Sequence, residues 1–374
     1  MTEQQNTPEL RFPEFKDKWK DYQLKDVIKV NSGKDYKHLT TGKYPVYGTG
    51  GYMLSVSNYL YENDAIGIGR KGTINKPYLL KGPFWTVDTL FYCTPLKENN
   101  LYFILNLFRK INWKKYDEST GVPSLSKITI NKVKCKIPPT SEQIKIGNFF
   151  SKLDRQIELE EEKLELLEAQ KKGYMQKLFS QEMRFKDNKE NNYPDWKIVK
   201  IGDILEERNE RSGEGDMLSV TINHGIIKFD EIDRKDNSSK DKSNYRKVYK
   251  DDIAYNSMRM WQGASGKSEY DGIVSPAYTV TIPNESINPD FIAYYFKTHK
   301  MIHKFKINSQ GLTSDTWNLK YRQLKDIKIN LCSKDEQNKI ANLLITYDKL
   351  INKQKHKLEI LKTNKKGFLQ KMFV

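Results

Sequence analysis

The sequence predicts an α+β protein with two globular segments of mixed helix and strand, separated by two long antiparallel coiled-coil helices in an internal pseudo-two-fold repeat. Three observations lead to this prediction. A stretch of 38 residues recurs later in the chain. Its apolar residues follow the spacing of a coiled coil. The residues that precede each copy also repeat, which indicates duplication of a whole unit.

The repeat is clearest from Glu142 to Phe179, which recurs as Glu336 to Phe373 at a constant offset of 194 residues and without a gap. Seventeen of the 38 aligned residues are identical, whereas chance would give about two or three. The similarity extends upstream, because ELRF at Glu9 to Phe12 recurs as EMRF at Glu182 to Phe185. The chain is therefore an internal duplication.

Each copy is expected to form a long helix. Its apolar residues step alternately by four and three, as in a coiled-coil seam. At about 1.5 Å per residue, each helix would be about 57 Å long. A helix of this length with one apolar stripe needs a partner. The residues expected to pair the two helices are Ile146, Phe150, Leu153, Ile157, Leu164 and Leu167 in the first copy, and Ile340, Leu344, Tyr347, Ile351, Leu358 and Leu361 in the second.

Charge favours pairing of the two copies with each other. Residues 158–168 contain six Glu and one Lys, whereas residues 352–362 contain four Lys and one Glu. These oppositely charged middles would meet in antiparallel packing, and they would also meet in parallel packing in register. Charge therefore indicates the partner and leaves the direction open.

The composition points to a polyanionic partner. The 374 residues suggest two or three domains, and the chain carries a net charge of +16. About +11 of this lies outside the two helices, which is typical of proteins that bind nucleic acid. Three scattered cysteines fit a reducing compartment. With no signal sequence and no long apolar run, we expect a cytoplasmic protein that does not bind membranes.

The globular segments are predicted to consist mostly of short strands and turns. In the first, strands are expected at Tyr44–Tyr47 and Ala65–Ile68, and a short helix at Leu101–Trp113. In the second, a single helix is expected from Asp290 to Lys304. The two segments are thus expected to share one scaffold.

The loops of the two segments can be matched by a single offset in residue number. An offset of 188 carries Pro95 onto Pro283 and Lys71 onto Arg259. The scaffold is therefore expected to repeat while the loop residues differ, as in two readers of different sequences.

Three motifs suggest chemistry, and each lacks a required part. Residues Gly67–Gly72 spell GxGxxG, but no helix is predicted to follow. Residues Gly263–Ser268 resemble a P-loop without its first glycine. His299 and His303 have the spacing of a zinc pair without a third ligand. With no adenine-methylation motif and no nuclease carboxylate cluster, the chain is predicted to be a binding protein rather than an enzyme.

The duplicated halves carry a family resemblance. Ile137-Pro138-Pro139 stands before Glu142-Gln143, at the start of the first long helix. Two halves, each with a variable segment and a long helix opened in this way, resemble the specificity subunit of type I restriction-modification systems. The resemblance covers nearly the whole chain. The second copy departs from it, with Asn330–Ser333 in place of the prolines.

This resemblance implies four parts: a first target recognition domain at 1–140, a spacer helix at 141–181, a second recognition domain at 182–334 and a second spacer helix at 335–374. Each recognition domain would read half of a bipartite, asymmetric site in double-stranded DNA. Two methyltransferase subunits would dock on the helices, and restriction and translocase subunits would join them. S-adenosylmethionine, ATP and Mg are expected on those partners, with no cofactor, metal or catalytic residue on this chain.

DNA contacts are expected from loops that place a cation beside a polar or aromatic group. The candidates are Tyr47, Thr49, Arg70, Lys71, Lys76, Ser119, Thr120 and Ser124 in the first domain, and Arg259, Trp261, Gln262, Lys267, Ser309, Gln310 and Thr313 in the second. Alternative interpretations are the recognition subunit of another restriction-modification type, a coiled-coil scaffold that binds no DNA, and a catalytic nucleic-acid enzyme.

Overall fold

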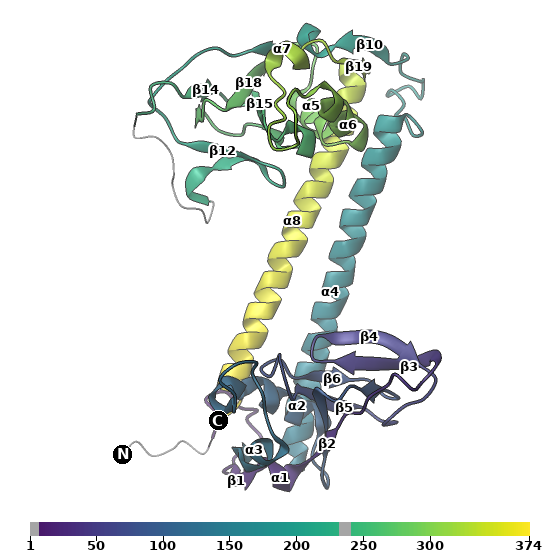
Figure 1. Ribbon diagram of the computed structural model, residues 1–374, viewed down its shortest axis with the longest axis vertical. Coiled ribbons are helices and arrows are strands. Elements are labelled where there is room, and N and C mark those ends of the chain that lie inside the picture. The colour runs from purple at the N-terminus through teal and green to yellow at the C-terminus, as the bar shows by residue number, and fades with distance from the viewer. Residues whose placement is uncertain (1–6, 232–240) are drawn as a thin grey trace. The chain divides into compact units, whose positions relative to one another are not determined.

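The computed structural model describes residues 7–231 and 241–374, so the first residues of the expected domain 1–140 and part of 182–334 lie outside it. The chain divides into two compact units. Unit 1 comprises Met1–Lys163 with Gln354–Val374, and unit 2 comprises Leu164–Lys353. Both units contain part of each long helix, α4 (Thr140–Ser180) and α8 (Lys334–Lys371) (Figure 1).

Unit 1 is built around a four-stranded antiparallel sheet in the order β2-β8-β5-β6, next to a hairpin formed by β3 and β4. The sheet strands are β2 (Ile28–Ser32), β8 (Leu90–Pro95), β5 (Ala65–Gly69) and β6 (Tyr78–Leu80). The other strands are β1 (Lys20–Gln23), β3 (Thr41–Gly48), β4 (Gly51–Val56), β7 (Trp85–Thr86) and β9 (Lys134–Ile137). The helices are α1 (Leu24–Val27), α2 (Leu101–Lys110), the 3-10 helix η1 (Trp113–Tyr116) and α3 (Lys127–Lys132).

Unit 2 repeats this plan with a sheet in the order β11-β18-β15-β16 and a hairpin formed by β12 and β13. The sheet strands are β11 (Leu205–Glu207), β18 (Tyr278–Pro283), β15 (Ile253–Asn256) and β16 (Ser265–Lys267). The other strands are β10 (Lys197–Lys200), β12 (Leu218–Thr221), β13 (Gly225–Lys228), β14 (Arg246–Val248), β17 (Gly272–Val274) and β19 (Lys328–Leu331). The helices are η2 (Ile201–Asp203), η3 (Phe229–Glu231), η4 (Met260–Gln262), α5 (Pro289–Phe296), α6 (His299–Asn308) and α7 (Tyr321–Leu324).

The ladder register corrects the expected loop equivalence by one residue. Ile66 of β5 pairs with Cys93, and Ile253 of β15 pairs with Thr281. Because Cys93 and Thr281 keep the offset of 188, Ile66 and Ile253 are equivalent at an offset of 187. The counterpart of Lys71 is therefore Met258 and not Arg259. Burial sets this register, since a slip of one residue would turn each side chain to the other face of the sheet.

The helix expected from Asp290 to Lys304 is two helices. The first ends at Phe296, and α6 begins at His299. Thr298 has an extended backbone, and its hydroxyl accepts a hydrogen bond from the backbone N–H of Met301. This N-cap satisfies a donor at the start of α6, which is why the chain turns here instead of continuing one helix.

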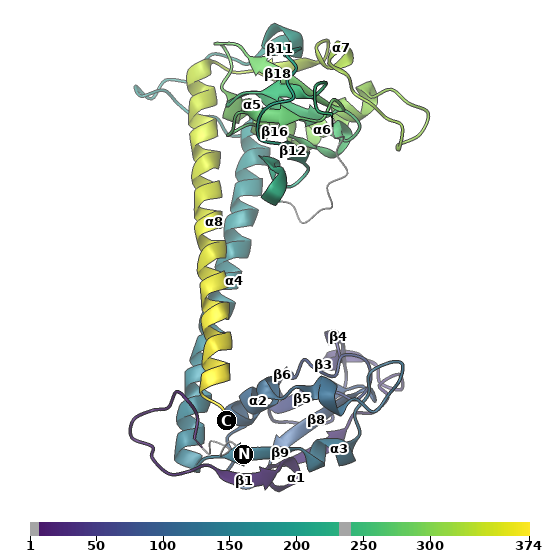
Figure 2. The ribbon, with the colours of Figure 1, turned by 90° about the vertical axis from the view of Figure 1, so that its left-hand side faces the viewer.

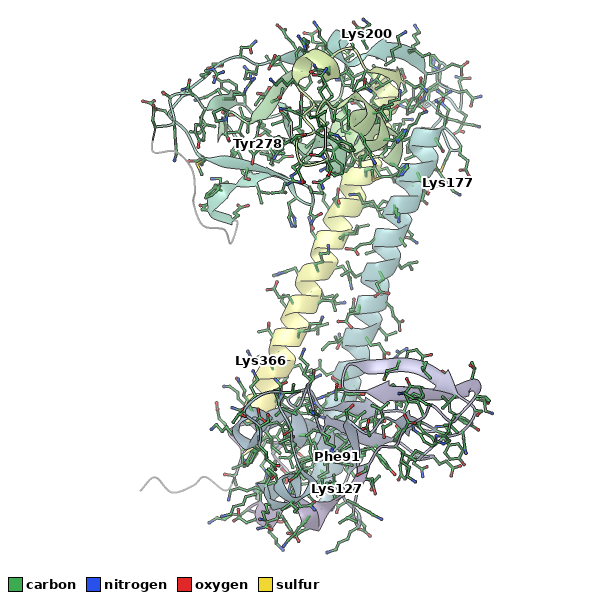
Figure 3. All side chains as sticks on the ribbon, viewed as in Figure 1. Phe91, Lys127, Lys177, Lys200, Tyr278 and Lys366 are labelled. Atoms are coloured by element: carbon green, nitrogen blue, oxygen red, sulfur yellow. The ribbon has the colours of Figure 1, made fainter. Side chains whose placement is uncertain are left out.

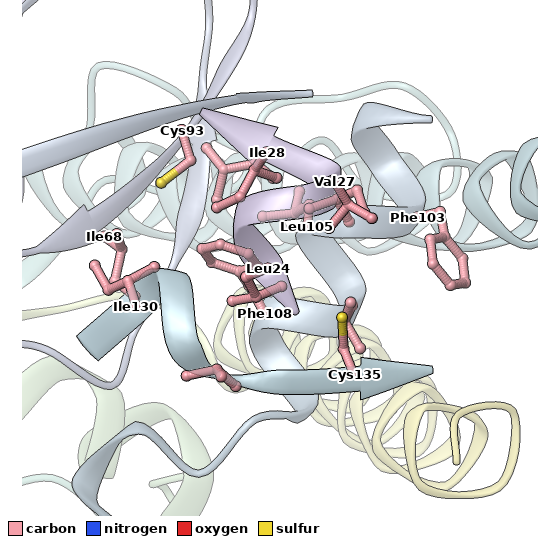
Figure 4. Close-up of a cluster of buried hydrophobic side chains, with 14 of the residues drawn as sticks. Leu24, Val27, Ile28, Ile68, Cys93, Phe103, Leu105, Phe108, Ile130 and Cys135 are labelled. Carbon is pink, nitrogen blue, oxygen red and sulfur yellow. The ribbon is translucent and has the colours of Figure 1, made fainter. Parts of the chain in front are cut away.

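The end of each long helix enters the core of a globular part. In unit 1, the ring of Phe373, just after α8, stacks on Phe103 with centroids 5.2 Å apart. In unit 2, the ring of Phe179 of α4 stacks on Tyr295 at 4.9 Å. Phe103 lies in the hydrophobic core shown in Figure 4. The two aromatic anchors are equivalent in the repeat, since Phe179 and Phe373 are the last residues of its two copies.

The two long helices run antiparallel within each unit (Figures 1 and 2). In unit 1, Asp154 pairs with Lys365 and Glu160 pairs with Lys357. In unit 2, the Lys171 ammonium lies 2.6 Å from the Asp348 carboxylate. Residue numbers rise along α4 as they fall along α8, which decides the direction that charge left open. The predicted α+β fold with two long antiparallel helices is confirmed.

A polar pair interrupts the seam in unit 1. The Gln354 amide donates to the Glu160 backbone carbonyl at 2.8 Å and to its carboxylate at 2.7 Å. Elsewhere on the two long helices, charged side chains such as Lys177 and Lys366 project from the surface (Figure 3). None of the helices among the described residues is long and apolar enough to cross a membrane.

The residues expected to pair the helices are buried to different degrees. The buried ones are Ile146, Phe150, Ile157, Ile340, Leu344, Ile351 and Leu358, and the half-buried ones are Leu153, Leu164, Leu167, Tyr347 and Leu361. Ile146 and Phe150 belong to the core of unit 1, and Ile340 and Leu344 to that of unit 2. The globular cores therefore help to bury the ends of the seam.

Candidate nucleic-acid interface

The candidate loops of unit 1 lie together. Lys71, in the loop after β5, forms an isolated β-bridge with Ser124. The Leu125 N–H donates to the Arg70 carbonyl at 2.9 Å, which ties the loop after β5 to the loop 117–124. A Cβ atom placed on Gly72 would lie 3.7 Å from the Thr49 hydroxyl, so the glycine-rich turn after β3 is also adjacent. Three loops that are far apart in sequence thus form one surface.

The loop 117–124 is ordered by its own carboxylate. Asp117 accepts hydrogen bonds from the backbone N–H groups of Ser119 and Ser124 at 3.0 and 2.9 Å. The bond from Ser124, followed by that from Ser119, holds the pKa of Asp117 below its ordinary value. The Ser119 hydroxyl lies 2.7 Å from the Val122 carbonyl and therefore contributes to the loop's shape. Thr120 and Ser124 stand beside it, exposed and half-buried.

The other candidates of unit 1 differ in exposure. Arg70, Lys71 and Lys76 are exposed, and the Arg70 guanidinium lies 3.4 Å from the Asp88 carbonyl. Tyr47 is half-buried, with its ring 6.2 Å from that of Tyr78. Burial raises the pKa of Tyr47. The three cations are therefore open to a partner, whereas the Tyr47 ring packs against Tyr78 and Phe84.

Two loops of unit 2 form the equivalent surface. The Leu319 N–H donates to the Ser257 carbonyl at 2.9 Å, as Leu125 donates to Arg70 in unit 1. The rings of Trp261 and Trp317 meet edge-on at 5.2 Å. These contacts tie the loop 257–263 to the loop 309–318. Arg259 and Met258 are exposed on this surface, and Trp261 and Gln262 are half-buried.

Two residues of this surface, Lys306 and Trp317, were not among the contacts predicted from sequence. The Lys306 ammonium lies 5.5 Å from the centre of the Trp317 ring, in the geometry of a cation–π contact. Trp317 follows a turn in which the Thr316 hydroxyl donates to the Thr313 carbonyl at 3.0 Å. The sequence did carry one signal for Trp317, which is a tryptophan within a loop of mostly polar residues. Its position beside Trp261 could not be read from the sequence, because the two tryptophans lie in loops that are far apart along the chain.

The loop 309–318 begins with two of the predicted residues. The Ser309 hydroxyl donates to the Phe305 carbonyl at 2.7 Å. Gln310 pairs with Asn318 in a β-bridge, and its side-chain carbonyl accepts from the Gln323 amide at 3.0 Å. Gln310 and Thr313 are exposed, and Ser309 is half-buried. The loop thus has a closed base and an exposed tip.

Lys267 is placed differently from the other candidates. Its side chain is 12% exposed, and its ammonium lies 2.9 Å from the carboxylates of both Glu269 and Asp290. Burial by itself would lower the pKa of Lys267, but the hydrogen bonds to these two carboxylates outweigh it and raise the pKa. A DNA phosphate would have to displace these partners. This geometry argues against the predicted DNA contact and assigns Lys267 to the structure of the unit.

The part of the chain that the structure describes holds no group of three or more His, Cys, Asp or Glu side chains that could bind a metal ion. In both units, two loops are joined just after an inner strand of the sheet, β5 in unit 1 and β15 in unit 2. The molecule is thus an internally duplicated protein with two loop surfaces and an antiparallel helix pair.

A family comparison agrees with this description. The model of the type I restriction modification DNA specificity domain matches residues 16–169 and 193–362, one copy in each half. The chain belongs to this family of specificity subunits, which are not the catalytic subunits of their systems.

Two specificity subunits of type I restriction enzymes are similar to this chain in sequence. The specificity subunit of the type I restriction enzyme MjaVIII from Methanocaldococcus jannaschii is 26% identical over 259 residues, covering 60% of this chain and 56% of the relative. The EcoDI specificity subunit from Escherichia coli is 25% identical over 289 residues, covering 72% and 62%. The chain therefore spans less than two thirds of the length of these relatives.

A solved structure shows the same fold. The crystal structure of the S subunit of a type I restriction-modification system from M. genitalium has a TM-score of 0.68 and 18% sequence identity, covering 98% of this chain and 99% of that chain.

Proposed function

We propose that this chain reads a bipartite, asymmetric site in double-stranded DNA, with residues 1–140 and 182–334 acting as two target recognition domains. The main support is the repeated loop surface. In unit 1, the N–H of buried Leu125 donates to the loop that follows β5. In unit 2, the N–H of the equivalent buried Leu319 donates to the loop that follows β15. Two similar platforms that carry different exposed residues suit the reading of two different half-sites.

The side chains on these platforms have the chemistry of groove contacts. Exposed Arg70, Lys71 and Lys76 in unit 1 and Arg259 in unit 2 can neutralise phosphates or bind guanine through O6 and N7. Neutral polar groups lie beside them, and those can donate to or accept from base edges. Exposed groups of this set are Thr120, Gln310 and Thr313, whereas Thr49, Ser119, Ser124, Trp261, Gln262 and Ser309 are half-buried.

The helices suit the role of a spacer. At about 1.5 Å per residue, α4 with 41 residues would be about 61 Å long, and α8 with 38 residues about 57 Å. Half-sites read from one face of DNA lie about 34 Å apart, or one helical turn. We propose that the pair at 141–181 and 335–374 keeps the two recognition domains at a fixed separation.

The proposal includes partners. Two methyltransferase subunits would dock on the helices, and restriction and translocase subunits would complete the complex. Leu159 and Leu166 of α4 and Ile360 of α8 are about half exposed and would supply apolar contacts for docking. S-adenosylmethionine, ATP and Mg would belong to those subunits. We place the complex in the cytoplasm, since three free cysteines fit a reducing compartment.

Selection from randomised duplexes tests this function. The full chain, assembled with the methyltransferase subunit of its own system, should enrich a motif with two fixed parts and an unread spacer. Lys71→Ala should relax or weaken one half of the motif. Lys16→Ala is the matched control, because it removes the same charge from an exposed position outside both the candidate loops and the long helices. Enrichment of no two-part motif by the wild-type complex would contradict the proposal.

A further inference from the structure

The hairpin of unit 2 corresponds to a hairpin that was already expected to touch DNA. In unit 1, β3 and β4 lie between β2 and β5 in the chain, and their turn carries Thr49. In unit 2, β12 and β13 lie between β11 and β15 in the chain. The turn of this second hairpin is Ile222-Asn223-His224. No DNA contact was predicted there, although its place in the order of strands is the same.

The turn Ile222–His224 has a defined shape. The Thr221 hydroxyl accepts the His224 N–H at 3.0 Å and donates to the Gly225 carbonyl at 3.1 Å. Gly225 has φ +66°, a left-handed conformation that favours glycine. A Cβ atom on Gly266 of β16 would lie 2.8 Å from the Gly225 Cα, so the hairpin backbone packs directly on the sheet. Its own bonds and this close packing fix the turn.

One half-buried lysine joins this turn to the loop 257–263. Lys297 follows α5, and its ammonium donates to the Ile222 carbonyl at 2.9 Å and to the Gly263 carbonyl. Gly263 ends the loop that carries Arg259 and has φ +85°. The two acceptors come from different loops. Lys297 therefore sets the distance between the turn and the loop.

The exposed groups of the turn suit base edges. Ile222 is 45% exposed, and Asn223 and His224 are exposed. An Asn amide can donate to and accept from adenine, and an imidazole offers ring nitrogens as donor or acceptor. The sequence from Thr221 to Gly225 contains no carboxylate that would repel phosphates. Arg259, on the neighbouring loop, supplies a cation.

We propose that the turn Ile222–His224 is a further DNA-contacting element of unit 2, in which Asn223 and His224 contact bases and Lys297 is the residue that positions them. The inference rests on the proposed function and deepens it. Unit 2 would then read its half-site with three elements: this turn, the loop 257–263 and the loop 309–318.

Base preference is the measurement that tests this role. The full chain with its methyltransferase partner is used to select randomised duplexes, first as wild type and then as Asn223→Ala/His224→Ala. The variant should lose preference at one to three adjacent positions in one half of the motif and bind the wild-type site about tenfold or more weakly. Asn188→Ala, at another exposed turn of unit 2, is the control that should leave the motif unchanged.

Lys297→Met tests the positioning role. It should relax the same positions as the double variant while the other half of the motif stays fixed, an effect that a general loss of stability would not produce. If the wild type selects no two-part motif, the proposed function fails. If the wild type selects one and the double variant keeps every preference, only the role of the turn is refuted. If Lys297→Met keeps them all, its positioning role is refuted.

Discussion

A buried ion pair at the start of α8 gives the sharpest test of how unit 2 is held together. The Arg184 guanidinium donates to both carboxylate oxygens of Glu336, at 3.1 and 2.9 Å. The Glu336 side chain is 1% exposed. Arg184 also donates to the Pro194 carbonyl at 2.6 Å. The ion pair thus joins the segment that follows α4 to the first turn of α8.

Arg184→Met should destabilise unit 2 by about 3–5 kcal/mol, because it leaves the Glu336 carboxylate buried without a counter-charge. The double variant Arg184→Met/Glu336→Gln should recover more than half of this loss, because no ionised group then remains buried. The cost therefore measures the orphaned charge rather than the attraction within the pair.

Urea denaturation, followed by tryptophan fluorescence, measures both variants. Arg11→Met is the matched variant in unit 1, where Arg11 donates to Glu142 at 2.7 and 2.8 Å, and it should show a loss of similar size. Arg155→Met removes an exposed pair with Glu158 and should cost at most about 1 kcal/mol. A loss below about 1 kcal/mol for Arg184→Met, or no recovery in the double variant, would refute the reasoning.

Three further predictions concern the candidate DNA-contacting loops, Lys297 and the helix seam. Lys71→Ala and Arg259→Ala should each weaken specific DNA binding by about 1–3 kcal/mol if the side chain contacts a base, and unchanged affinity in gel-shift titrations would exclude both residues from the interface. Burial lowers the pKa of Lys297 from 10.5 to about 8. Between these values the unfolded chain holds a proton that the folded unit has released, so raising the pH should stabilise unit 2, and Lys297→Met should flatten this rise in urea titrations at about pH 7 and about pH 10. Glu160→Leu/Gln354→Leu should raise the urea midpoint of the helix pair, because apolar side chains would fill the seam; a lower midpoint would show that the polar contact is favourable in itself.

The sequence by itself determined the repeat, the long helices and the charge that pairs them. These features are local or periodic, so they can be read along the chain: the constant offset between the two copies, the steps of four and three, and the acidic and basic middles. The α+β class was predicted from these long helices together with the short strands and turns expected in the remaining segments. The loops that carry Lys71 and Arg259 were also identified from sequence as candidate contact loops.

Only the tertiary structure decided what depends on burial and on contacts between distant residues. The pairing of Asp154 with Lys365 and of Lys171 with Asp348 decided the antiparallel direction, which charge allowed either way. The ladder of β15 shifted the loop equivalence by one position from the offset expected. Lys267 looks like any loop lysine in the sequence, yet folding surrounds it with carboxylates. The partners of Lys297 lie 75 and 34 residues away, and local sequence carries no signal for contacts at such separations.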